Sequence, residues 1–187
     1  MSEDIRHQAS DSEMRGRSGA ESTSELARLA KLHGYTVAEG DPDIRGWDVR
    51  TVDGWKFGEV EDLIVDTAAM RVRYLVVRIG KELLAGDADR RLFVPLGTAR
   101  LDDEGDNVIV ERVPIDGFAG FLTSRDYLTS DDERSLHRAY GYGQPGTPNA
   151  EVFGRALYDD RGFWGRRRQG GEDVPYIVRS PRGAERR

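Results

Sequence analysis

The chain has no cysteine, and it has only three histidines and three lysines among its 187 residues. The absence of cysteine excludes disulfides, thiolate nucleophiles and cysteine zinc sites. Because His7, His33 and His137 are widely spaced, we do not expect a histidine metal cluster. The sequence also lacks a P-loop lysine and a serine in a nucleophile elbow, so these two kinds of catalytic site are excluded.

Long apolar runs are missing as well. No segment approaches the roughly 18 apolar residues that a membrane-spanning helix needs. The first ten residues, MSEDIRHQAS, contain no apolar core of a secretory signal. We therefore expect a cytoplasmic protein, with no cofactor and no metal. GYGQPG at 141–146 fits a dinucleotide-binding pattern, but Pro145 and Pro148 prevent the helix that must follow it.

Charge is abundant and unevenly distributed. Charged residues make up 33% of the chain and hydrophobic residues 37%, so part of the chain is expected to lie outside any core. Residues 41–113 contain 16 acids and 11 bases, a net charge of −5, whereas residues 141–187 contain 6 acids and 9 arginines, a net charge of +3. This asymmetry indicates one acidic folded domain with an arginine-rich extension.

Two short helices are predicted beside this domain. Residues 1–23 are predicted to be a disordered polar tail. The first helix is predicted at about 24–33, with a capping box at Ser22 and Glu25, and a linker follows it to residue 40. A helical extension covers 119–143, with a helix at about 130–140 that Thr129 or Ser130 caps. Residues 144–187 form a Gly/Pro/Arg-rich tail with little fixed structure, apart from docking by side chains of Phe153, Leu157 and Tyr158.

Six β-like runs occupy the middle of the chain. Asp53-Gly54 predicts a hairpin turn, and the short connections favour antiparallel neighbours. A bulge near Glu61–Asp62 would let Val60, Leu63 and Val65 face inward together. YLVV at 74–77 is apolar on both faces, and Pro95 should end a strand or lie on an edge. The predicted strands are 46–52, 55–66, 71–79, 91–95, 98–102 and 107–112.

These runs together resemble the PRC-barrel family over about residues 41–113, within a domain that we place at 41–118. The resemblance rests on the Gly46-Trp47 strand opening, the Asp53-Gly54 turn, Gly58, the DLIVD strand ending at Asp66, and Tyr74 with VPL at 94–96. It implies a mainly β fold, a small antiparallel barrel of about six strands. It also implies a non-catalytic module for protein interaction or regulation, with an unidentified protein partner or a second copy.

Two alternatives follow from the same resemblance. SRDYLTSDDERSLHRAYGYG at 124–143 is similar to the segment after the barrel in photosynthetic reaction-centre H subunits. That likeness implies a soluble or peripheral relative that supports electron and proton transfer. The ribosome maturation factor of the same family implies a role with ribosomes or RNA.

Six carboxylates lie between residues 46 and 66, and they allow different readings. The segment 41–46 resembles the start of a calcium-binding loop. We do not expect calcium binding, because Arg45 would occupy the fifth position of that loop and Val52 the twelfth, and both positions need an oxygen ligand. A proton relay depends on burial beside a membrane partner. The favoured interpretation is a solvated face with arginines across the strands, Asp66 near Arg71 and Ile64 near Arg73.

Three groups of residues are candidates for binding. Trp55 and Phe57 are candidates for a protein contact, with packing under the flanking helices as the alternative, whereas Trp47 is expected in the core. Gly46 and Gly58 could allow the close approach of a ligand, but we favour the interpretation that they lie where a strand bends. Arg166, Arg167 and Arg168, in GFWGRRRQGG with Phe163 and Trp164, are candidates for binding RNA or another polyanion.

Overall fold

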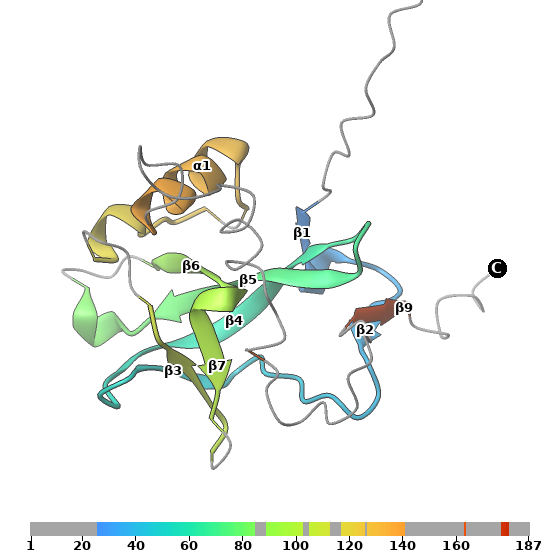
Figure 1. The fold of residues 1–187 in the computed structure, drawn as a ribbon, viewed down its shortest axis with the longest axis horizontal. Coiled ribbons are helices and arrows are strands. Elements are labelled where there is room, and N and C mark those ends of the chain that lie inside the picture. The colour runs from blue at the N-terminus through green and yellow to red at the C-terminus, as the bar shows by residue number, and fades with distance from the viewer. Residues whose placement is uncertain are drawn as a thin grey trace, which may run out of the picture.

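A computed structural model describes residues 26–84, 89–102, 105–112, 117–125, 127–140, 163 and 177–179. Its largest element is a seven-stranded mixed sheet with the order β6-β5-β4-β3-β8-β7, in which β1 also pairs with β4 (Figure 1). These strands are β1 (Leu26–Arg28), β3 (Asp48–Thr51), β4 (Lys56–Asp66), β5 (Arg71–Ile79), β6 (Arg91–Pro95), β7 (Ala99–Leu101) and β8 (Asn107–Val110).

The remaining elements are short. A separate pair joins β2 (Tyr35–Val37) to β9 (Ile177–Arg179). The helix α1 (Ser130–Ala139) lies over β6 on one side of the sheet (Figure 1). Four 3₁₀ turns cover η1 (Leu29–Lys31), η2 (Lys81–Leu83), η3 (Leu96–Thr98) and η4 (Ala119–Phe121).

The six predicted strands of the middle region are confirmed within two residues at each end. The turn at Asp53-Gly54 is confirmed as well, with Gly54 at φ +86°, a conformation that glycine adopts without strain. Pro95 is the last residue of β6, which is an end strand of the sheet, so its missing N–H removes no ladder hydrogen bond. These features depend on local sequence, which explains their agreement.

The prediction of a purely antiparallel sheet is wrong. β3 and β8 pair in parallel, with Asp48 opposite Asn107 and Thr51 opposite Val110. Short connections force antiparallel pairing only on strands that follow each other in the sequence. The chain between β3 and β8 contains β4 to β7, which is long enough to serve as the crossover of a parallel pair. Within the described residues β6 and β7 do not pair with each other, so the sheet is not closed into a barrel there.

The predicted bulge in β4 is confirmed. Val60 pairs with Val77 and Asp62 with Val76, so Glu61 is the extra residue on β4. After this change of phase, Val60, Leu63 and Val65 all lie buried in the main hydrophobic core. The bulge therefore resolves the imperfect alternation of EDLIVD.

The sheet is covered on both faces, as the YLVV run predicted. Leu75 and Val77 lie in the main core, whereas Tyr74 and Val76 lie in a second cluster with Leu136 of α1. Thr129 caps α1 through a reciprocal capping box with Asp132, which confirms the predicted helix start. Tyr74 also donates its hydroxyl to Glu133 Oε1 at 2.9 Å, which attaches α1 to the sheet.

The predicted helix at 24–33 is wrong. Residues 26–28 form β1, with Leu26 opposite Asp66 and Arg28 opposite Ile64, and η1 follows. β3 covers only the first part of β4, so the second part of β4 has a free edge that β1 satisfies. Ser22 and Glu25 of the expected capping box lie outside the described residues.

The expectation of little fixed structure after residue 144 is wrong at two places. Phe163 is 1% exposed and belongs to the main core, and Ile177–Arg179 form β9. The docking candidates Phe153, Leu157 and Tyr158 lie outside the described residues. The folded unit therefore includes residues from the far C-terminal part of the chain.

Gly58 provides a test of how closely β4 and β5 pack. A Cβ at this position would lie 2.5 Å from the carbonyl oxygen of Arg78, which is backbone and cannot move aside. We expect Gly58→Ala to lower the free energy of unfolding by about 1–3 kcal/mol, as overpacking does. Gly120→Ala is the matched control, because its Cβ would meet nothing within 4 Å. Urea denaturation measures both, and equal losses would contradict this account.

Phe163 provides a test of the C-terminal contribution to the core. We expect Phe163→Ala to lower the free energy of unfolding by about 3–5 kcal/mol, the usual cost of removing a buried aromatic ring. Tyr127→Ala, at a side chain that is 56% exposed, should change it far less. A loss below about 1 kcal/mol for Phe163→Ala would show that the ring is not part of the core.

Candidate functional site

The tip of the β3–β4 hairpin, residues 51–55, has a well-fixed backbone. Thr51 N donates to Trp55 O at 2.9 Å, and Gly54 N donates to Thr51 O at 2.9 Å. The Thr51 hydroxyl donates to the Asp53 carboxylate, and this hydrogen bond lowers the pKa of Asp53. Arg50 Nη1 also donates to the Gly54 carbonyl at 3.1 Å. The tip is therefore a pre-shaped turn, with few alternative conformations to lose on binding.

Two large apolar side chains of this tip are exposed to solvent. Val52 is 71% exposed and Trp55 is 54% exposed. Phe57 is only 3% exposed, and its ring stacks on Phe118 with centroids 5.3 Å apart. Of the two alternatives for the aromatic pair, packing thus holds for Phe57 and exposure for Trp55. A candidate contact surface that includes Phe57 is therefore wrong. Trp47 packs partly buried against the main core, as predicted.

A ladder of alternating charges crosses the sheet beside this tip. Arg50 contacts both Asn107 Oδ1 at 3.0 Å and Asp48 Oδ2 at 2.9 Å. Lys56 Nζ then bridges Asp48 Oδ1 at 2.6 Å and Glu59 Oε1 at 3.2 Å. These pairs lower the pKa of both carboxyls, first through their hydrogen bonds with Lys56. The solvated-face interpretation holds for these two acids.

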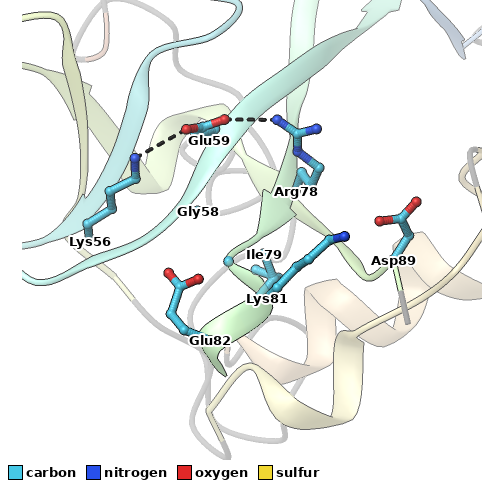
Figure 2. Close-up of a pocket in the computed structure, with 9 residues that line it drawn as sticks. Lys56, Gly58, Glu59, Arg78, Ile79, Lys81, Glu82 and Asp89 are labelled. Carbon is cyan, nitrogen blue, oxygen red and sulfur yellow. Dashed lines mark hydrogen bonds and ion pairs between the residues drawn. The ribbon is translucent and has the colours of Figure 1, made fainter. Parts of the chain in front are cut away.

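The ladder ends at a polar pocket of about 380 Å³. Figure 2 shows Glu59 between Lys56 and Arg78, whose Nη2 lies 2.8 Å from Glu59 Oε2. Ligand pockets are mostly apolar with a few polar groups, whereas the side chains here are mostly charged, three of each sign. The pocket thus carries no net side-chain charge that would favour a cation or an anion. Its lining residues are Lys56, Gly58, Glu59, Arg78, Ile79, Gly80, Lys81, Glu82 and Asp89.

Asp62 departs most from the solvated-face prediction, because it is fully buried. Its carboxylate accepts hydrogen bonds from Arg28 Nε at 2.7 Å, Leu63 N at 2.8 Å and Ala30 N at 3.3 Å. β1 and η1 cover this part of β4 and supply two of these donors. A carboxylate that is enclosed and fully paired cannot reach a substrate, so Asp62 fixes the N-terminal strand.

Glu61 extends this network toward the surface. It accepts from Arg28 Nη2 at 2.8 Å and from Arg91 Nε at 2.8 Å, and its side chain is 22% exposed. Burial raises the pKa of Glu61, but the hydrogen bonds from Arg28 and Arg91 outweigh it, so the pKa lies below its usual value. The network joins β1, β4 and β6 through side chains.

Asp66 is the sixth acid of the run, and it is also buried. Its carboxylate accepts from the backbone N–H of Ala68 and Ala69, which shapes the turn after β4. Arg73 Nη2 pairs with it at 2.9 Å. Asp66 is opposite Arg71 as predicted, but Ile64 is opposite Tyr74 instead of Arg73, because a second register shift follows Ile64.

The other sequence candidates fall in three places. Asp43 of the calcium-like segment pairs with Arg45. Gly58 lies against the β5 backbone, so close strand packing explains this glycine better than the approach of a ligand does. Arg166, Arg167 and Arg168 lie outside the described residues, but Phe163, expected to stack on bases beside them, is buried in the core.

Sequence reasoning missed a second pocket, of about 210 Å³, between α1, η4 and β6. Phe93 and Leu136 provide apolar lining, and Arg125 pairs with Asp132 Oδ1 at 2.7 Å at its polar part. The amphipathic pattern of α1 was visible in the sequence. The pocket was not, because it depends on where η4 lies relative to that helix.

The fold and site define a small domain with a mixed sheet, a helix on one face and an exposed apolar hairpin tip. Residues 37–115 match the family model of the PRC-barrel domain. The matched range holds the strands β3 to β8, whereas β1, α1, Phe163 and β9 lie outside it. No helix among the described residues is long and apolar enough to cross a membrane.

The Arg28–Glu61–Arg91 network predicts a specific dependence of stability on pH. The pKa of Glu61 is lower in the folded protein than in the unfolded chain. The contribution of Glu61 to the free energy of unfolding is therefore complete above the unfolded pKa of about 4.3, and it is lost as pH falls through the folded pKa. We expect Glu61→Gln to be less stable than wild type at pH 7, with the difference shrinking below about pH 4.3. Urea denaturation at several pH values measures this difference.

Glu111→Gln is the control for this experiment. Glu111 pairs with Arg100 at 2.8 Å, but its side chain is 51% exposed. Exposed pairs contribute at most about 1 kcal/mol, so this variant should stay close to wild type throughout. A Glu61→Gln difference that is equally large at pH 7 and pH 3 would contradict the linkage.

Proposed function

We propose that this protein is a non-catalytic protein-binding module whose contact surface is the β3–β4 hairpin tip. The observation that carries the proposal is the exposure of Val52 and Trp55 within this five-residue tip. Four large hydrophobic side chains are exposed among the described residues, and two of them share this tip. An exposed tryptophan next to a second apolar side chain is typical of a protein contact.

The surroundings of the tip fit such a contact. Trp55 lies 6.3 Å, between ring centroids, from the buried Phe57, so its ring has one neighbour that is fixed in the core. Asp48, Arg50 and Lys56 lie at its base in the charge ladder. An apolar anchor with charged neighbours matches the usual arrangement of an interface, a dry centre within a polar rim.

The acids of the 46–66 run support a role without catalysis. Each of the six has a partner, which is a cation for five of them and the Thr51 hydroxyl for Asp53. General acid–base catalysis needs a carboxyl that can reach the substrate, whereas these groups are committed to pairs, turns and the bulge. We therefore assign the run to structure.

The other two functions from the sequence have less in their favour. The PRC-barrel match is shared by the photosynthetic and the ribosomal interpretations, so it does not choose between them. The burial of Phe163 removes one of the two rings on which base stacking depended. No contact among the described residues favours either function over protein binding.

A pull-down compares the intact chain with the variant Val52→Ser/Trp55→Ser. We expect partner capture to fall by about 30-fold or more, since a hot-spot side chain contributes at least about 2 kcal/mol. Stability should change little, because both side chains are largely exposed. Quantitative mass spectrometry of the captured proteins measures the loss, and sedimentation velocity shows whether the partner is a second copy.

Leu83→Ser is the matched control, because Leu83 is an exposed hydrophobic residue that lies in η2 and not in the tip. It should capture the same proteins as the intact chain. If the tip variant also captures them undiminished, the hairpin tip is not the contact surface and the proposal fails.

A further inference from the structure

The short strand β2 has an unusual partner. Its three residues pair antiparallel with β9, which comes from the far C-terminal part of the chain, with Tyr35 opposite Arg179 and Val37 opposite Ile177 (Figure 1). The family match covers residues 37–115, so β9 lies outside it and β2 overlaps it only at Val37. The edge of β2 is therefore filled by a segment that the PRC-barrel match does not include.

Side chains as well as backbone define this contact. The guanidinium carbon of Arg179 lies 5.9 Å from the centre of the Tyr35 ring, within the range of a cation–π interaction. Val178 stands opposite Thr36 at the middle of the pair. Tyr35 and Val37 also pack against the main core, so β2 is fixed in place whether or not β9 is paired.

The strand β9, in contrast, is weakly held. The β2–β9 pair consists of two strands and three residue pairs, and it is separate from the large sheet. Isolated two-stranded pairs are marginally stable, and such short elements open at low free-energy cost. Phe163 anchors the same part of the chain in the core, so a detached β9 would stay tethered near its edge.

We propose that β2 is a strand-docking edge and that β9 occupies it as a built-in competitor. When β9 detaches, the edge accepts an extended peptide segment by strand addition, in which backbone hydrogen bonds supply affinity. The preferred segment follows the pattern of β9, with a β-branched residue opposite Thr36 and an arginine opposite Tyr35. This inference concerns a different surface from the hairpin tip and does not depend on it.

Competition has a measurable size. The apparent dissociation constant of a peptide is the intrinsic constant divided by the fraction of chains in which the edge is free. If β9 is docked in about nine of ten molecules, opening the edge should improve peptide affinity by about tenfold. The tether strengthens this competition because it keeps β9 at a high local concentration.

The experiment uses a fluorescein-labelled peptide of residues 174–182, VPYIVRSPR, and measures its binding by fluorescence anisotropy. Three proteins are compared: the full chain, a chain ending at Gly171 that keeps Phe163, and the full chain with Val178→Pro. Proline removes the N–H of residue 178 and disfavours the strand. We expect both altered proteins to bind the peptide at least about tenfold more tightly than the full chain.

Two control peptides test the mode of binding. The same peptide with Val178→Pro should not bind at comparable concentrations, because it cannot add as a strand. The peptide with Arg179→Ala should bind about two- to fivefold more weakly, the effect of losing one exposed cation–π contact. If the chain ending at Gly171 does not fold, the Val178→Pro full chain still decides the question.

Three results would overturn the proposal. One is equal binding of the peptide to the full chain and to both altered proteins, which would mean that β9 does not compete. Another is no binding to a folded protein whose edge is open, which would mean that β2 does not accept strands. The third is equal binding of the Val178→Pro peptide, which would mean that binding does not use strand pairing.

Discussion

β4 carries one extra residue at Glu61, directly before Asp62, whose side chain is fully buried under β1 and η1. A buried carboxylate is costly unless cations and N–H groups surround it. Arg28 of β1 and the backbone of η1 provide these partners, so the buried Asp62 is stable only while the N-terminal strand is docked. The change of phase at the bulge places Leu63 and Val65 in the core. The docking of β1 is thus coupled to the buried Asp62, and the continuity of the core to the bulge beside it.

Coverage of both sheet faces determines where apolar surface remains open. The main core occupies one face of β4 and β5, and α1 closes the other through Leu136 and the bond from Tyr74 to Glu133. The hairpin tip extends beyond both layers, which is why Val52 and Trp55 stay exposed while Phe57, two residues further along, is buried. The exposed tip is thus a consequence of the hairpin's length relative to the layers that cover the sheet.

Features that depend on neighbouring residues could be predicted from the sequence. The Asp53-Gly54 turn, the Thr129 cap and the two-faced YLVV strand each rest on a few adjacent side chains. Features that join distant segments could not. The pattern around Leu26 and Leu29 is compatible with a helix, and only the free edge of β4 makes residues 26–28 a strand. In the same way, nothing within IVR at 177–179 indicates a partner at Tyr35.

The candidate site shows the same division at the level of single side chains. Alternation placed Trp55 and Phe57 on one face, which left both exposed or both packed. The structure separates them because Phe118 stacks on Phe57 from a part of the chain far away in sequence. Likewise, six acids in one run suggested a wet face, whereas Arg28 and Arg73 take Asp62 and Asp66 into buried pairs. The role of an acidic run can be judged only when the positions of its cationic partners are known. Here these partners show that the acids stabilise the fold.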